Sequence, residues 1–496
     1  MEKFNTQVPF LFILLLTVYP IIFSGVSKTV ITDEILTVFI EGTVTPEQQY
    51  TYRLEPFVVP EGTGALEFTF DYEGRRVHSE MEIGLFDPQG FRGTSRFSKS
   101  TFYISKYRTT ASYFPGPILE GEWNISLGFP TITQDASYTV TIRMIPENHP
   151  EYYGPSNVAL NDASQWYRGD FHTHTGHSDA FGCHDTRGNR STCQVWHVAE
   201  ASHRNGLDFV SINDHNTVSH HQDIKIAQPT FPDLLLLRGQ EVTTFYGHMN
   251  VIGTSIPVDF RIGFDEMTVN HIQKNSLSLG SLLVIAHPGR ETGARCTGCG
   301  WSADHTDYHI VDAIEIVNGT NIETDISGIP FWHERLNEGY MITGIGGSDD
   351  HGGGFGRAQP GTPTTMVYAG ALSESALLDA VRKGRVYLKT RNPYGPEVEF
   401  TVTAGDQVYE MGDVVSGNDY RLDEVLIQIG YTQRNENTLE LILNSEILDL
   451  EPSASQVYRD KAFKTFRLKI EDSGWLRFNL RDSEGITVIS NPIYFR

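Results

Sequence analysis

The chain has 496 residues, more than the roughly 250 to 300 at which one hydrophobic core stops growing, so we expect two or three domains. Hydrophobic residues make up 39% and charged residues 20%, with only four cysteines, which excludes a disordered chain and a disulfide scaffold. The formal net charge of -24 argues against duplex nucleic acid as a partner, because that binding depends on Lys and Arg displacing counterions.

The N-terminus begins with a short polar head that contains Lys3, followed by an apolar run over residues 8–23 and small residues over 24–27. This order is typical of a secretory signal peptide, which we place at residues 1–27. A retained membrane anchor is the less favoured alternative, because a spanning helix needs about 20 apolar residues and this run contains two prolines. We therefore expect a protein secreted to the periplasm or the cell exterior, with no membrane span in the mature chain.

Residues 28–150 alternate apolar and polar side chains in short runs that end at Gly, Pro and Asp. This pattern predicts an antiparallel β-sandwich of jelly-roll type. Its aromatic side chains could bind carbohydrate, but we favour a structural role because scattered aromatics in a sandwich usually belong to the core. Residues 151–165 are predicted to be a linker.

Residues 166–391 change to apolar, strand-like runs that alternate with amphipathic helices. One such helix places Val195 and Val198 at helical spacing and is expected to end at Gly206. Alternating strands and helices predict a mostly parallel sheet, and this many strands close most economically as a barrel. Residues 392–496 return to short alternating strands and are predicted to form a second β-sandwich.

The four cysteines fall into two close pairs: Cys183 with Cys193, and Cys296 with Cys299. Because export takes them to an oxidising compartment, we favour two local disulfides. Two alternatives remain for Cys296 and Cys299. A structural zinc site would need both pairs to converge, and a redox pair would need a following helix.

Metal-binding residue types follow the apolar runs of residues 166–391. In the segment from Asp170 to His174, the two-residue spacing of His172 and His174 on a strand sends both imidazoles to one face, where they can share a cation. Later runs each end in further His, Asp, Glu or Asn residues: Asp179, Asp214, His215, Glu241, His248, His287, Asn318, Asp349 and His351. Burying so many unpaired polar groups would be costly, so a shared cation is the simplest explanation.

The motifs D-x-H-x-H, DHN, G-x-E, G-H, AHP and SDxH, in this order over about residues 167–390, resemble the PHP (polymerase and histidinol phosphatase) superfamily of metallohydrolases. With a β-sandwich on each side and the ending SNPIYFR, the chain is similar to the secreted CehA/McbA branch, which is named after a carbaryl hydrolase. The resemblance implies a distorted (βα)7 PHP barrel that holds two or three divalent metal ions, such as Zn, Mn or Fe.

The resemblance also implies how the ligands are divided. His172 and His174, with Glu241 and Asp349, would hold one metal; Glu241 would bridge to a second, also bound by His248 and His287; and Asp179, His215 and His351 would hold the third. The family often has TDH and SDG where this chain has Asn213-Asp214-His215 and Ser178-Asp179-Ala180. These departures adjoin ligands of the third metal.

The implied activity is hydrolysis of a small-molecule ester by a hydroxide that bridges two metals, most readily a phosphomonoester or phosphodiester. His351 or His215 would protonate the leaving oxygen if the third metal is absent. Arg290 and Arg357 would fork onto an anionic substrate oxygen, or are ordinary loop arginines. Asp170, Asp214 and Asn318 would orient imidazoles or the nucleophilic water.

Two other functions remain open. The first is hydrolysis of a carbamate, carboxylic ester or amide, which predicts an apolar pocket instead of cationic groups facing the metals; the orientation of Arg290, Arg357, Tyr246 and Phe355 separates the two. The second is a non-catalytic surface or glycan-binding protein. Five further histidines in predicted loops are expected to be solvated or to assist the ligands: His177, His184, His220, His221 and His305.

Overall fold

The computed structural model describes residues 26–496, apart from residues 33, 97, 150, 151, 153, 294–295, 357, 421–423 and 433–436. The predicted signal peptide therefore lies almost entirely outside the described residues, and so does Arg357. No helix within the described part of the chain is long and apolar enough to cross a bilayer. The chain divides into two compact units, Met1–Phe102 with Leu119–Met144, and Tyr103–Ile118 with Ile145–Arg496.

The first unit is built from two β-sheets. One has the order β1 (Val26–Thr32), β2 (Ile35–Val44), β9 (Ala136–Pro146), β4 (Thr63–Tyr72) and β7 (Thr101–Ser105), and the other β3 (Tyr52–Val59), β8 (Gly121–Ile132), β5 (Ser79–Asp87) and β6 (Gly90–Arg96). Phe57 of β3 meets Phe68 of β4 edge to face, with ring centroids 6.0 Å apart. The two sheets thus share an aromatic core, as the alternating pattern predicts for a β-sandwich.

Seven strands of the second unit lie side by side in chain order: β10 (Gln165–Thr173), β13 (Phe209–Ile212), β14 (Leu235–Thr243), β15 (His248–Ile252), β16 (Leu282–Ala286), β17 (Ala313–Asn318) and β18 (Thr343–Gly347). Strands such as β16, LLVIA, are buried along their whole length, as expected of strands covered on both faces. The first and last strands also approach each other, since the amide of Asp349 donates to the carbonyl of His172 at 2.8 Å.

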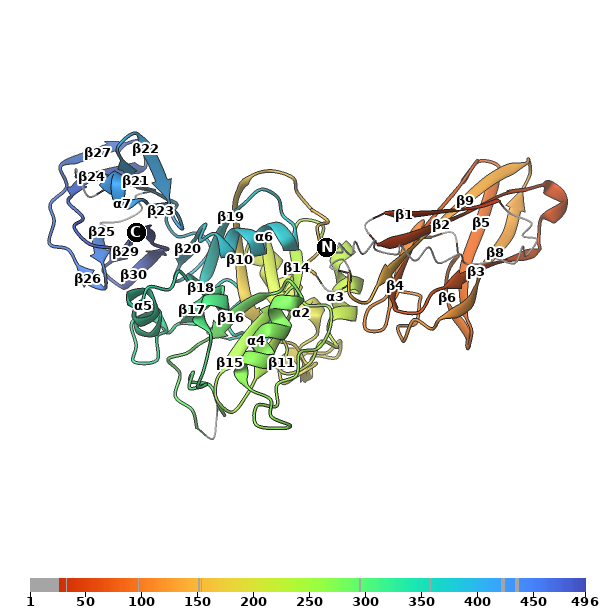
Figure 1. The fold of residues 1–496 in the computed structure, drawn as a ribbon, viewed down its shortest axis with the longest axis horizontal. Helices are drawn as coiled ribbons and strands as arrows, with labels where there is room; N and C mark the ends of the chain where they lie inside the picture. The colour runs from red at the N-terminus through yellow and green to blue at the C-terminus, as the bar shows by residue number, and fades with distance from the viewer. Residues whose placement is uncertain are drawn as a thin grey trace, which may run out of the picture. The chain divides into compact units, whose positions relative to one another are not determined.

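The predicted alternation of strands and helices is only partly present. Helices α2 (Val195–Arg204), α3 (His221–Ala227), α4 (Val269–Ser278) and α5 (Ile329–Asn337) lie in the connections of these strands (Figure 1). By contrast, β14 and β15 are joined by the short segment 244–247 and pair antiparallel. A parallel pair needs a crossover of about a dozen residues, so this connection is too short for one. The strand β15 also pairs antiparallel with β16.

Helix α2 agrees with its prediction in both position and burial. It buries Val195, Val198 and Ser202, and the chain leaves it through Gly206, whose φ of 73° lies in the left-handed region that favours glycine. A small hairpin of β11 (Phe181–His184) and β12 (Arg190–Thr192) precedes the helix.

The C-terminal strands continue the central sheet. After β10 the sheet continues with β19 (Thr364–Ala369) and β20 (Val386–Lys389), which are connected by helix α6 (Glu374–Arg382). The next strands in the sheet are β30 (Gly485–Ser490), β29 (Gly474–Asp482), β25 (Thr438–Leu443) and β26 (Glu446–Ile447). A second sheet has the order β22 (Gln407–Glu410), β21 (Val398–Ala404), β24 (Val425–Thr432), β28 (Lys461–Leu468) and β27 (Ala454–Tyr458). The short elements β23 (Val414–Val415), α7 (Gly417–Tyr420) and β31 (Ile493–Phe495) complete this part.

These two C-terminal sheets pack face to face, with Phe400 of β21 against Phe478 of β29 at 5.3 Å between centroids. Their core also takes in Met366 of β19 and Tyr387 of β20, which lie before the predicted boundary at residue 391. The second sandwich therefore shares a sheet and a core with the central strands and is not a separate compact unit.

Candidate metal centre

All nine predicted ligands lie in small groups whose ligand atoms are within 4.8 Å of one another. There are five such groups among the described residues: His174, Asp179, His215 and His351; His172, His174 and Glu241; His172, His287 and Asp349; His215, Glu241 and His248; and His248, His287 and Cys299. His248 is the first residue of β15, which runs antiparallel to its neighbours. Its side chain nevertheless lies in the same cluster as the other predicted ligands. Residues that are far apart in the sequence thus form one continuous cluster.

Strand β10 brings the first two histidines together. The rings of His172 and His174 have centroids 5.0 Å apart, and their Nε2 atoms are 3.1 Å apart. The Asp170 carboxylate accepts hydrogen bonds from the amides of His172 at 3.0 Å, Ser348 at 3.0 Å and Gly361 at 2.8 Å. Burial raises the pKa of Asp170 to about 6. Asp170 therefore fixes the backbone around the predicted ligands: among the described residues its carboxylate bonds to backbone amides and not to an imidazole, and its expected role in orienting a water stays a prediction.

The carboxylate of Glu241 lies at the middle of the cluster and is fully buried. Its Oε1 is 3.1 Å from His248 Nδ1 and 3.1 Å from His287 Nε2. Its Oε2 is 2.7 Å from His215 Nδ1 and 3.5 Å from His172 Nε2. Burial alone would raise the pKa of Glu241, but the surrounding imidazoles hold it well below its usual value. An ionised carboxylate at this position can bridge two cations.

Hydrogen bonds on the outer side of three imidazoles determine which ring nitrogen carries the hydrogen. His172 Nδ1 lies 3.2 Å from both oxygens of Glu315, His248 Nε2 lies 3.0 Å from the carbonyl of Thr297, and His287 Nδ1 lies 3.2 Å from the carbonyl of Cys299. Since carboxylates and carbonyls only accept, these nitrogens donate. In the neutral form of each ring, the opposite nitrogen carries a lone pair that faces Glu241. Although burial opposes it, the carboxylates of Glu315, Glu241 and Asp349 raise the pKa of His172 well above its usual value, so this ring has a strong tendency to hold a positive charge next to Glu241.

Lone pairs that converge on a carboxylate repel one another unless a positive charge lies between them. The Nδ1 atom of His174 is buried without a hydrogen-bond partner among the described residues. Glu241 Oε2 also has no well-directed hydrogen bond there, although His215 Nδ1, which bonds with Thr243, lies 2.7 Å from it. Burial and the neighbouring His351 lower the pKa of His174 to about 4, so its ring is neutral near pH 7. The donors are nitrogen and oxygen, and they fit divalent cations such as Zn, Mn or Fe.

The group that was predicted to hold a third metal lies on the open side of the cluster. His351 Nε2 is 3.3 Å and His215 Nε2 3.8 Å from Asp179 Oδ1, and the side chain of Asp179 is 59% exposed. Although burial opposes it, the hydrogen bond and charge of Asp179 raise the pKa of His351 to about 9. Ser178 belongs to the segment in which the sequence departs from the family pattern. Its hydroxyl donates to Asp214 at 2.6 Å, and it is not part of this group.

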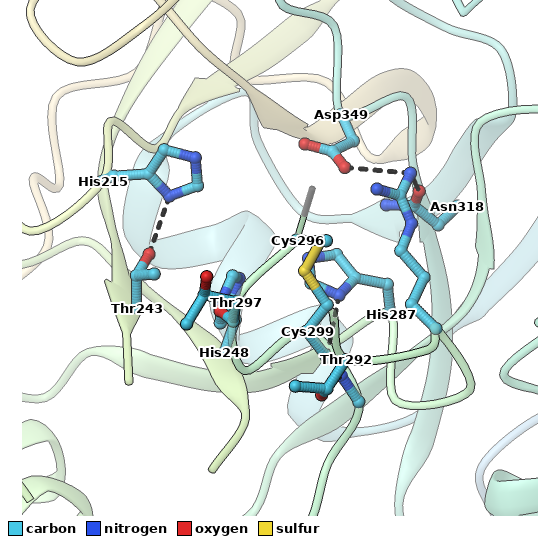
Figure 2. Close-up of a disulfide and its surroundings, with 12 residues drawn as sticks. His215, Thr243, His248, His287, Thr292, Cys296, Thr297, Cys299, Asn318 and Asp349 are labelled. Atoms are coloured by element: carbon cyan, nitrogen blue, oxygen red, sulfur yellow. Dashed lines mark hydrogen bonds and ion pairs between the residues drawn. A yellow bond between two sulfur atoms is a disulfide. The ribbon is translucent and has the colours of Figure 1, made fainter. Parts of the chain in front are cut away.

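Arg290 lies at the edge of the cluster. Its Nη2 is 3.1 Å from Asp349 Oδ2 and also donates to Asn318 Oδ1, while its side chain keeps 29% exposure. Asn318 in turn donates to Glu315 Oε2 at 3.2 Å, so it bonds to Arg290 and Glu315 and not to an imidazole. Figure 2 shows Asn318 and Asp349 on the same side of the site.

Asp214 and the five loop histidines lie outside the ligand groups. Asp214 is buried, accepts from Thr175 and lies 3.0 Å from Nδ1 of His220, so it does orient an imidazole, although not that of a predicted ligand. His177 pairs with Asp223 at 3.0 Å. His221 lies 3.1 Å from the carbonyl of Gly239 in the core. His184 and His305 belong to none of the groups found in the described residues.

Two parts of the site were not predicted. Glu315 is buried in β17. Its carboxylate accepts hydrogen bonds from His172, from Asn318 and, at 2.9 Å, from the amide of His287. A carboxylate inside the apolar run AIEIVN is the signal that could have identified it. The second part is the pair of carbonyls at Thr297 and Cys299, for which side-chain patterns give no signal.

Comparisons with known proteins do not identify a family. No family model matches the chain, and no curated protein matches it. One matching solved structure is the N-terminal CBM22-1–GH10 part of endo-1,4-beta-D-xylanase 10B from Clostridium thermocellum, complexed with xylohexaose, at 8% identity and a TM-score of 0.14. The match covers 65% of this chain and 58% of the xylanase chain, and at this TM-score it supports no inference about this chain.

Proposed function

We propose that the protein is a secreted metal-dependent hydrolase of the PHP type, with its central strands as the distorted (βα)7 barrel, and that it acts on phosphoesters. The observation that carries the proposal is the arrangement around Glu241. His172, His248 and His287 each direct one ring nitrogen toward one ionised, buried carboxylate, and in their neutral forms these rings and the carboxylate would all be satisfied by a shared metal cation.

The ligands would divide as the resemblance implies. Glu241 would be shared by a position with His172, His174 and Asp349 and a position with His248 and His287, while Asp179, His215 and His351 would form the third. Bound cations would act as Lewis acids on the ester oxygen and make water nucleophilic near neutral pH. The protein's part is to hold the donors in place from buried strand ends, with Glu315 and Asp170 fixing ring and backbone.

With only two cations bound, His215 and His351 would bind no metal. They would line the open side of the cluster, next to Asp179. Either imidazole could then act as a general acid and donate a proton to the leaving oxygen of an ester that binds on that side. The exposed Asp179 next to both rings supports the charged form of the proton donor.

A phosphoester is favoured because a guanidinium stands at the edge of the cluster. The Arg290 side chain is partly exposed and its Nη2 lies 3.1 Å from the ligand Asp349, so an anionic substrate oxygen close to the metals would be within reach of a positive charge. A neutral aryl carbamate or ester is the second candidate, because the rings of Tyr246 and Phe355, on loops next to ligands, are 46% and 58% exposed.

The proposal is tested by metal analysis together with turnover of a nitrophenyl phosphodiester and a naphthyl carbamate. Protein purified without chelator is expected to carry at least two equivalents of metal, to hydrolyse the phosphodiester, and to lose and regain this activity with chelator and added metal. Turnover of the carbamate alone would support the second candidate. Less than one equivalent of metal and no turnover of either compound would contradict the hydrolase proposal and favour a non-catalytic binding protein.

A further inference from the structure

The short segment from Cys296 to Cys299 forms the outer wall of one metal position. Its two cysteines are bonded to each other, with Cα atoms 5.5 Å apart, as the sequence favoured, and the second pair, Cys183 and Cys193, is bonded as well. The carbonyl of Cys299 accepts from His287, and that of Thr297 from His248. Figure 2 shows the disulfide beside these two imidazoles.

Close backbone packing holds this segment against the site. Gly298 has a φ of 73°, and a Cβ atom there would lie 2.0 Å from the carbonyl oxygen of Thr244. The amide of Ser302 donates to the carbonyl of Tyr246 at 2.7 Å. Cys299 is consequently buried beside the imidazoles, whereas Cys296 is only partly buried.

The sulfur of Cys299 is close enough to the imidazoles to become a ligand itself. Its Sγ, one ring nitrogen of His248 and one of His287 lie within 4.8 Å of one another. While the sulfur is bonded to Cys296, it has no negative charge and is a poor ligand, because the thiolate is the metal-binding form. The disulfide therefore decides whether a thiolate is available beside these two imidazoles.

We propose that reduction of the Cys296–Cys299 disulfide creates a thiolate-containing metal site made of Cys299, His248 and His287, which selects Zn²⁺ over Mn²⁺. The inference rests on the proposed metal centre, since both histidines belong to its second position. Soft thiolate ligands favour Zn²⁺, and carboxylate and water favour Mn²⁺. The redox state of one bond thereby sets which metal occupies the position.

The chemistry needs a dithiol reductant. The reductant supplies two electrons and two protons, the bond between the sulfurs breaks, both cysteines become thiols, and the dithiol becomes its own disulfide. Cys299 then releases its proton to solvent as its sulfur binds the cation. Cys296 is absent from the ligand group, so its thiol stays available to close the bond again when an oxidant is present.

Two matched variants test the inference with Co²⁺ as a probe for Zn²⁺. C296S leaves Cys299 as a free thiol, C299S leaves Cys296 free, and both lose the same disulfide while Cys183 and Cys193 remain paired. We expect a near-ultraviolet thiolate-to-cobalt band in C296S without reductant, and in wild type that was reduced with dithiothreitol and then freed of it under nitrogen, since dithiothreitol itself binds Co²⁺ through sulfur. We expect no such band in the oxidised wild type, in C299S, or in C296S combined with H287A. Competition between Zn²⁺ and Mn²⁺ should favour Zn²⁺ at least about tenfold more in C296S than in C299S.

Equal spectra and equal metal preference in C296S and C299S would overturn the inference and leave the proposed function untouched, provided the oxidised wild type binds Co²⁺. An oxidised wild type that binds no Co²⁺ would instead contradict the proposed metal centre itself. If neither variant folds, as judged by far-ultraviolet circular dichroism, the reduced wild type decides by the presence or absence of the same band.

Discussion

Both carboxylate oxygens of Glu315 lie 3.2 Å from Nδ1 of His172, and both groups are fully buried. This contact places a hydrogen of His172 on Nδ1, so that in the neutral ring the lone pair of Nε2 points toward the cluster. The same carboxylate accepts from the amide of His287, so one side chain orients ligands of two proposed metal positions.

Removing Glu315 should therefore weaken metal binding without removing a ligand. Loss of such a partner typically costs about 10- to 100-fold in metal affinity. We expect E315A to show this loss in a competition titration with a chelating dye. E315Q should lose less, because its amide oxygen still accepts from His172. Equal affinity in the wild type and E315A would show that Glu315 does not control the imidazole.

The position of Arg290 beside Asp349 predicts a substrate-dependent effect. Loss of a charge-assisted hydrogen bond costs about 1.5 to 3 kcal/mol, so R290A should raise KM for a nitrophenyl phosphodiester about 10- to 100-fold. The metal content should stay at the wild-type level, and the ratio of kcat/KM for phosphodiester over naphthyl carbamate should fall by the same factor. R290K keeps the charge and should lie between the two. If R290A left the ratio of the two kcat/KM values unchanged, Arg290 would have no role in binding anionic substrates.

A half-buried histidine outside the groups of predicted ligands predicts how stability depends on pH. His333 of α5 accepts from Arg477 Nε at 3.0 Å, and burial together with the charge of Arg477 lowers the pKa of His333 to about 3. Because the unfolded chain takes up this proton near pH 6.5, the contribution is complete above that pH and is lost as the pH falls toward 3.

We expect this one group to lower the free energy of unfolding by up to about 1.4 kcal/mol per pH unit below pH 6.5. H333Q keeps an acceptor for Arg477 but does not titrate, so it should remove this part of the slope in urea unfolding measured from pH 7 to pH 4.5. Identical slopes for H333Q and the wild type would contradict the assignment.

The shared sheet predicts that the chain cannot be divided at residue 391. Without β30, strand β20 would keep β19 but lose its other neighbour, and Met366 and Tyr387 would lose the core they share with Phe478. A chain that ends at residue 391 is expected to aggregate or to melt without cooperativity, as measured by size-exclusion chromatography and circular dichroism. A soluble monomer with a cooperative transition would show that the central strands fold alone.

The nine predicted ligands were expected from the order of the motifs and the resemblance that they carry, and the structure brings these residues together. For His172 and His174 the period of two on a strand already predicts a common face. Their binding of metal stays a prediction. The hairpin of β14 and β15 was also accessible, since its connection is too short for a crossover, but the alternating pattern around it concealed this. Glu315, the carbonyls of Thr297 and Cys299, and the shared core of Tyr387 were not accessible, because tertiary packing alone chooses their partners.

The central claim is that Glu241 bridges cations held by strand-end histidines, and metal stoichiometry in E241Q tests it most directly. Gln keeps the shape of the side chain but removes the negative charge between His215, His248 and His287. We predict at least two equivalents of metal in the wild type and less than one in E241Q, measured by elemental analysis of folded, monodisperse protein. Wild-type metal content in folded E241Q would contradict the account.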